Sequence, residues 1–189
     1  MYRPNLREKK ITEGVSFRLG KDLLDELRLE AEQKQISLNT FANQIFRQFM
    51  DWHLSAAKAG WVPVQREMLR SMIDKSSDED IVMLAENIAR TQMPEFILLL
   101  RREYDFASFL DVMEAWMKVS QFPYNHRSND DKHLFVIQHE LGKKWSLYMK
   151  KLFETVCEEL ASRPEISMTD NTITVKVDAV KCGVASIRP

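Results

Sequence analysis

Gly14-Val15-Ser16-Phe17-Arg18-Leu19 is the stretch that decides the fold at the N-terminal end of this 189-residue chain. Its apolar side chains, at positions 15, 17 and 19, alternate with Ser16 and Arg18, and this period of two predicts a half-buried β-strand. The pattern then changes to helical spacing, first over residues 21–34 and again from Leu38 to about residue 53. The predicted order is therefore one short strand followed by two helices.

One strand and two helices cannot satisfy all their backbone groups or bury their apolar faces alone. The simplest solution is pairing with the same strand of a second chain across a two-fold axis. The resulting two-stranded ribbon would rest its apolar face on four helices and present Ser16 and Arg18 twice, in a shape that fits the major groove of B-DNA. The alternative is that this unit belongs to an ordinary monomeric α+β domain.

The second helix opens with Ile36-Ser37-Leu38-Asn39-Thr40, in which Ser37 is expected to accept from the backbone N–H of Asn39 or Thr40. With this opening and the preceding strand, residues 13–50 resemble a ribbon-helix-helix DNA-binding domain, the class of dimeric repressors, partition proteins and antitoxins. The resemblance implies that Ser16 and Arg18 read base edges, and that the backbone around Ser37, Leu38 and Asn39 docks on a phosphate. The turn between the helices, Lys34-Gln35, contains no glycine, and a left-handed residue there costs roughly 1–2 kcal/mol.

The basic residues of the chain are concentrated at its N-terminal end. The whole chain has a net charge of −1, whereas residues 1–21 hold six basic and two acidic side chains. Lys9, Lys10 and Lys21 are expected to contact phosphates, which positions a protein on DNA without specifying sequence. A solvated tail is the alternative interpretation of this basic arm.

The fold class predicted for the whole chain is mainly α with a small β component. We expect a basic arm (1–12), a ribbon-helix-helix domain forming an intertwined dimer (13–53), a linker (54–63), a C-terminal domain that is helical and then α+β (64–178), and a tail (179–189). The α+β part is predicted as β-α-β-β, with a strand at 133–138, a helix at 142–161 and a hairpin at 165–177 that turns at Asp170-Asn171. Residues 124–131 are predicted to be a polar loop.

Three local signals set helix ends in the C-terminal domain. Ser76 and Glu79 fit a capping box, Met93-Pro94 is expected to end the helix that follows, and Asp105 is a candidate cap for the next one.

No catalytic motif is found in the sequence. It lacks a glycine-rich phosphate loop, a nucleophile elbow and a metalloprotease helix, and its four histidines and two cysteines lack metal-ligand spacing. We therefore expect no enzymatic activity, no cofactor and no metal. Cys157 is expected to be a small buried apolar residue. Lys143, Lys144, Lys150 and Lys151 are interpreted as a solvated helix face, with a second nucleic-acid patch as the alternative.

The composition, 44% hydrophobic and 29% charged, is that of a folded globular protein. The sequence has no apolar run long enough to cross a bilayer and no signal-peptide pattern, so we expect a cytoplasmic, nucleoid-associated protein.

The sequence as a whole predicts a sequence-specific regulator of transcription, a repressor by default, that binds duplex DNA as a homodimer through residues 13–50. The alternative is a protein-interaction or small-ligand sensor module, including an antitoxin-like adaptor. In that case residues 60–178 bind the partner or ligand and the N-terminal unit mainly dimerises.

Overall fold

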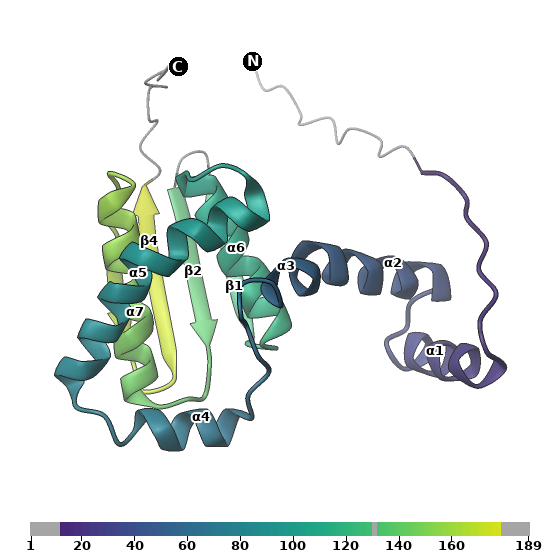
Figure 1. Ribbon diagram of the computed structural model, residues 1–189, viewed down its shortest axis with the longest axis horizontal. Coiled ribbons are helices and arrows are strands. Elements are labelled where there is room, and N and C mark those ends of the chain that lie inside the picture. The colour runs from purple at the N-terminus through teal and green to yellow at the C-terminus, as the bar shows by residue number, and fades with distance from the viewer. Residues whose placement is uncertain (1–11, 130–131, 179–189) are drawn as a thin grey trace, which may run out of the picture. The chain divides into compact units, whose positions relative to one another are not determined.

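The computed structural model describes residues 12–129 and 132–178, and it divides the chain into two compact units, residues 1–45 and 46–189 (Figure 1). The described residues are mainly helical with one small antiparallel sheet, which confirms the predicted class of mainly α with a small β component. None of the helices in the described part of the chain is both long and apolar enough to cross a membrane.

The first unit contains two helices, α1 (Lys21–Gln33) and the start of α2 (Leu38–Gln48). Ser37 Oγ accepts the Thr40 N–H at 3.0 Å, as its predicted capping role requires. Gln35 in the turn has a φ of 54°, which is the left-handed conformation expected of this glycine-free turn. Residues 12–20 form neither helix nor strand in the single chain, and the predicted strand pairing needs a second copy. The ribbon-helix-helix arrangement therefore stays a prediction.

The second unit begins at Phe46, near the end of α2. A short π-helix, η1 (Phe49–His53), leads into α3 (Leu54–Ala56). Trp52 and Ala56 are both buried in the core of this unit. Residues 54–63, predicted as a linker, lie within the second unit, and Ala56 belongs to its core.

Four longer helices follow in the second unit: α4 (Arg66–Ile73), α5 (Asp78–Arg101), α6 (Phe106–Val119) and α7 (Lys143–Glu159). Asp105 caps α6 as predicted, since its carboxylate accepts the Ser108 N–H at 2.7 Å. The capping box of α5 lies one residue later than predicted, with Ser77 and Asp80 in the two roles. Pro94 does not end α5, which continues to Arg101. The helix tolerates a ring that removes one backbone donor because apolar residues on both sides, Met93 and Phe96, anchor it in the core.

The sheet has four antiparallel strands in the order β1-β2-β4-β3: β1 (Tyr124–Asn129), β2 (Lys132–Gln138), β3 (Glu165–Met168) and β4 (Thr172–Asp178). The strands predicted at 133–138 and 165–177 and the helix between them are confirmed. The prediction of a polar loop at 124–131 was wrong, because Tyr124–Asn129 pairs along its whole length with β2. The order is thus β-β-α-β-β instead of β-α-β-β.

The core lies between one face of the sheet and the helices. Phe135, Ile137, Ile173 and Val175 are fully buried on this face of the two central strands. Helix α7 packs on the sheet and α5 packs on α7 (Figure 1). Burying large apolar side chains stabilises such a core by roughly 1.5–3 kcal/mol each. The second unit therefore has a sizeable core of its own.

Candidate functional site

The residues predicted to read DNA bases lie in the extended segment before α1. Ser16 and Arg18 are both exposed, and they alternate with the apolar residues of the predicted strand. Lys21 is exposed at the first position of α1. Lys9 and Lys10 lie outside the described residues. The structure thus leaves the described side chains of this set accessible to a partner.

The predicted phosphate-docking site is the N-terminus of α2. Ser37 caps the helix, Leu38 is half-buried and Asn39 is exposed. The backbone N–H groups of Leu38 and Asn39 have no acceptor among the described residues, and the first turn contains no acidic residue. Free N–H groups and the helix dipole favour an anion at such a position.

The apolar side chains of the first unit are largely uncovered in the single chain. Val15 is 74% exposed and Leu29 is 55% exposed, and Leu19, Leu23 and Ile45 are also exposed. Ala31 is the one buried residue of α1, and α2 has none. An exposed apolar surface of this kind is a feature of interaction sites.

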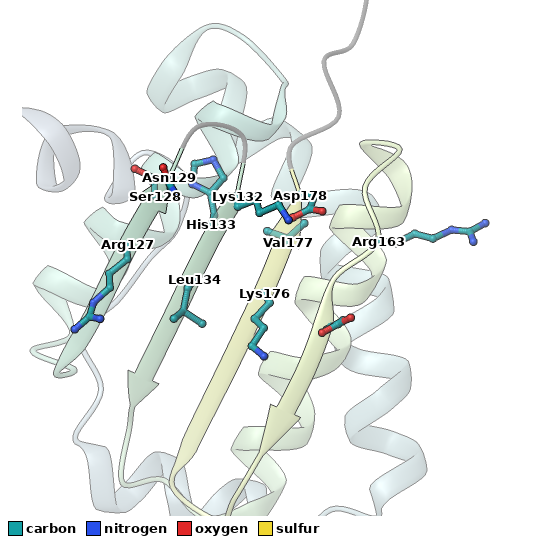
Figure 2. Close-up of a pocket in the computed structure, with 11 residues that line it drawn as sticks. Arg127, Ser128, Asn129, Lys132, His133, Leu134, Arg163, Lys176, Val177 and Asp178 are labelled. Atoms are coloured by element: carbon teal, nitrogen blue, oxygen red, sulfur yellow. The ribbon is translucent and has the colours of Figure 1, made fainter. Parts of the chain in front are cut away.

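A second candidate lies on the sheet face opposite the core. It is a depression of about 600 Å³, where Arg127, Leu134, Lys176 and Glu165 form one row across the four strands. Figure 2 shows Arg127, Leu134 and Lys176 on three of these strands. Lys132 and Asp178 are neighbours in the next row. Arg127 and Arg163 extend away from one another, so the cations do not converge on a single point as they would in a small-anion site (Figure 2).

Two histidines form a hydrogen-bonded chain on the core face of the sheet. Glu114 Oε1 lies 2.5 Å from His126 Nδ1, and His126 Nε2 lies 3.0 Å from His133 Nδ1. Burial is the largest single effect on the pKa of Glu114 and raises it. The hydrogen bond to His126 and the charge of Lys118 together outweigh burial, so the pKa of Glu114 is lowered from its usual value. The two rings stack, and the His126 ring also stacks on Phe135. This chain fixes the position of α6 against β1 and β2.

His139 belongs to a separate network at the corner between β2 and α7. It is fully buried, accepts the Leu141 N–H at Nδ1 (3.1 Å) and lies 2.8 Å from Ser146 Oγ through Nε2. Ser146 in turn donates to the Thr169 carbonyl at 2.7 Å. Burial lowers the pKa of His139 to about 4. Because all its ring nitrogens are engaged, the network holds the corner in place.

The remaining candidates among the described residues are potential metal ligands, Cys157 and the lysines of α7. No cluster of three or more potential metal ligands occurs in the described part of the chain. Cys157 is fully buried, as predicted, and burial raises the pKa of its thiol to about 12, so the reactive thiolate is disfavoured at neutral pH. Three of the four lysines of α7 have partners: Lys144 donates to the Ser76 carbonyl, Lys150 pairs with Glu154, and Lys151 pairs with Glu86.

Searches against family models and curated proteins find no match for this chain. The function is therefore argued from geometry and chemistry. Sequence reasoning missed the charged row on the sheet because it placed Arg127 in a loop. The one available signal was the alternation of Tyr124 and His126 with polar neighbours.

Proposed function

We propose that the protein binds duplex DNA as a homodimer and regulates transcription in the cytoplasm, with residues 13–50 as its DNA-binding unit. The single observation that carries this proposal is the apolar surface of the first unit. Ala31 is the one buried residue of α1, and α2 has no buried residue. The two helices and the alternating segment therefore need a second surface to form a core.

A second copy of the chain is the occupant that fits this surface best. In a dimer, the alternation at residues 15–19 would give each copy a strand with one apolar face. Pairing two such strands satisfies their backbone groups and covers both apolar faces at once. The same pairing places Ser16 and Arg18 from both copies on the outer face of the ribbon.

That outer face supports recognition of DNA. An arginine can donate two hydrogen bonds to guanine O6 and N7, and each such pair discriminates against a wrong base by about 1–3 kcal/mol. Ser16 would add a weaker contact, Lys21 a phosphate contact, and the free N–H groups at the start of α2 a second phosphate contact. A two-fold protein of this kind binds an inverted repeat.

The first test is selection of randomised duplex DNA by the full chain, followed by sequencing of the retained molecules. We expect enrichment of an inverted repeat. Arg18→Ala should weaken binding to that site by about 1–3 kcal/mol per bidentate contact. Arg28→Ala is the matched control, because Arg28 lies on α1 and pairs with Asp25 (3.2 Å) outside the alternating segment.

The dimer is tested separately by sedimentation equilibrium. Leu19→Glu should convert the dimer into a monomer and abolish DNA binding, because it places a charge in the shared apolar face. If no sequence is enriched, or if Arg18→Ala discriminates as the parent does, base reading by the ribbon is wrong. A parent protein that stays monomeric would contradict the pairing itself.

A further inference from the structure

A cavity of about 530 Å³ lies in the second unit, apart from the residues proposed to bind DNA. Its walls come from η1 and α3, from the segment that follows them into α4, from the end of α6 and the residues after it, and from Leu141 and the first turn of α7. A volume of this size is typical of sites for small organic molecules. The cavity plays no part in the function proposed above.

The cavity is walled by all four tryptophans of the chain: Trp52, Trp61, Trp116 and Trp145. The ring centroids of Trp61 lie 5.1 Å from Trp52 and 5.6 Å from Trp116, and those of Trp116 and Trp145 lie 6.2 Å apart. Trp61 is 37% exposed, whereas the other three are largely buried. Three indoles are thus held in the core. The fourth, Trp61, stacks on Phe96 with centroids 5.1 Å apart and is partly exposed.

Tryptophan rings select for flat, apolar molecules. They offer wide, rigid faces on which an aromatic ring stacks or meets an edge, and such pairs add about 0.5–1.5 kcal/mol beyond the area they bury. Most of the remaining lining is aliphatic, including Val62, Leu69 and Leu141. The lining therefore favours a planar aromatic group.

The charge of the lining indicates a second feature of the ligand. Among the described residues, no aspartate or glutamate lines the cavity, and the guanidinium of Arg66 is the one permanent charge in its lining. That guanidinium lies 5.5 Å from the centroid of the Phe122 ring, which is also in the wall, and donates to Glu140 at 3.0 Å. The Glu140 side chain is 71% exposed. Exposed ion pairs contribute little free energy, so a carboxylate held in the cavity can compete for this arginine.

We propose that this cavity binds a planar aromatic carboxylate, with the ring among the tryptophans and the carboxylate on Arg66. Arginine suits this role because its planar fork matches both oxygens of a carboxylate. The proposal does not depend on DNA binding, and its test reads ligand binding alone.

The probe is 2-naphthoate, titrated into the full ¹⁵N-labelled chain. The four indole N–H signals are assigned by replacing each tryptophan with phenylalanine in turn, and calorimetry gives the dissociation constant. We expect saturable shifts of the indole signals, with Trp61 among those that move. The neutral analogue 2-naphthamide separates the contribution of the carboxylate from that of the ring.

Two pairs of measurements locate the probe. Ala57 is exposed and lines the cavity, whereas Ala59, on the same turn, does not line it. Ala57→Phe should fill the cavity and abolish binding, and Ala59→Phe should bind as the parent does. Arg66→Gln should weaken 2-naphthoate about tenfold, because a charge-assisted hydrogen bond is lost, and should leave 2-naphthamide unchanged. Dispersed backbone signals show that each variant is folded.

Three results would overturn the proposal. The first is the absence of saturable shifts with millimolar probe. The second is binding that survives in Ala57→Phe, which would place the probe outside the cavity. The third is an equal loss of both probes in Arg66→Gln, which would remove the carboxylate from the proposed ligand.

Discussion

Acidification from pH 7 to pH 4.5 should destabilise the second unit through His139, a buried side chain whose tautomer is set by its partners. Nδ1 accepts the Leu141 N–H, so the ring hydrogen is on Nε2 and is donated to Ser146 Oγ. A second ring proton would bind to Nδ1, and the Nδ1–H would then point at the Leu141 N–H, which is also a donor. The folded state therefore holds His139 neutral.

The magnitude follows from the difference in proton affinity between the folded and unfolded states. Burial lowers the pKa of His139 from 6.5 to about 4. Between these values the unfolded chain binds the proton and the folded chain does not, so stability rises with pH across this window and falls on acidification. The whole difference corresponds to about 3 kcal/mol, of which about 2.5 kcal/mol is already lost at pH 4.5.

Urea unfolding of the full chain, followed by tryptophan fluorescence at both pH values, measures this loss. Carboxylates also titrate in the window, so the informative quantity is the difference between the parent and His139→Gln. The variant should be about 1–3 kcal/mol less stable at pH 7, because the longer glutamine side chain does not hold an acceptor at the position of Nδ1 for the Leu141 N–H. Its loss of stability on acidification should be smaller than the parent's by about 2.5 kcal/mol.

His53→Gln is the matched control, because His53 is exposed. This variant should lose as much stability on acidification as the parent. The reasoning is refuted if His139→Gln loses as much stability as the parent, since the proton that destabilises the fold would then bind elsewhere.

Three further substitutions test backbone strain and an unsatisfied polar group. Gln35→Gly should stabilise the first unit by about 1 kcal/mol in thermal unfolding by circular dichroism, because glycine adopts a positive φ without cost. Gln33→Gly, at the last residue of α1, should instead destabilise it, because glycine is a poor helix former. Pro94→Ala should stabilise the second unit by about 2 kcal/mol in urea unfolding, because it restores a backbone donor inside α5; an unchanged midpoint would mean that the helix already accommodates the ring. Ser162→Ala should stabilise it by about 1 kcal/mol, because the buried Ser162 hydroxyl has no hydrogen-bond partner among the described residues, and the exposed Ser167→Ala should change nothing.

Local signals in the sequence predicted most helices and three of the four strands. The caps Ser37 and Asp105 each place a hydroxyl or carboxylate before an apolar stripe, and such signals act within a few residues. Strand β1 escaped prediction because Tyr124 and His126 are the only half-buried side chains in an otherwise polar run. Its pairing depends on β2, which a local pattern does not reveal.

The same limit applies more strongly to the candidate sites. The alternation around Arg18 is a local pattern, so a DNA-reading segment could be predicted from it. The cavity brings together Trp52, Trp61, Trp116 and Trp145, which are scattered over four segments and share no motif. They become neighbours only through the packing of η1, α6 and α7. The spacing of residues in the sequence does not predict such packing.

The strand order β1-β2-β4-β3 has a consequence for how the second unit folds. Each outer strand pairs with its neighbour in sequence, so β1 with β2 and β3 with β4 form two separate hairpins. Hairpins of this kind form in about 1–10 μs. The β2–β4 ladder alone joins the halves, and it must close a loop that contains all of α7. We expect this closure, with its larger entropy cost, to be a slow event in folding, and mutations along the β2–β4 ladder to retard folding more than mutations at either outer edge.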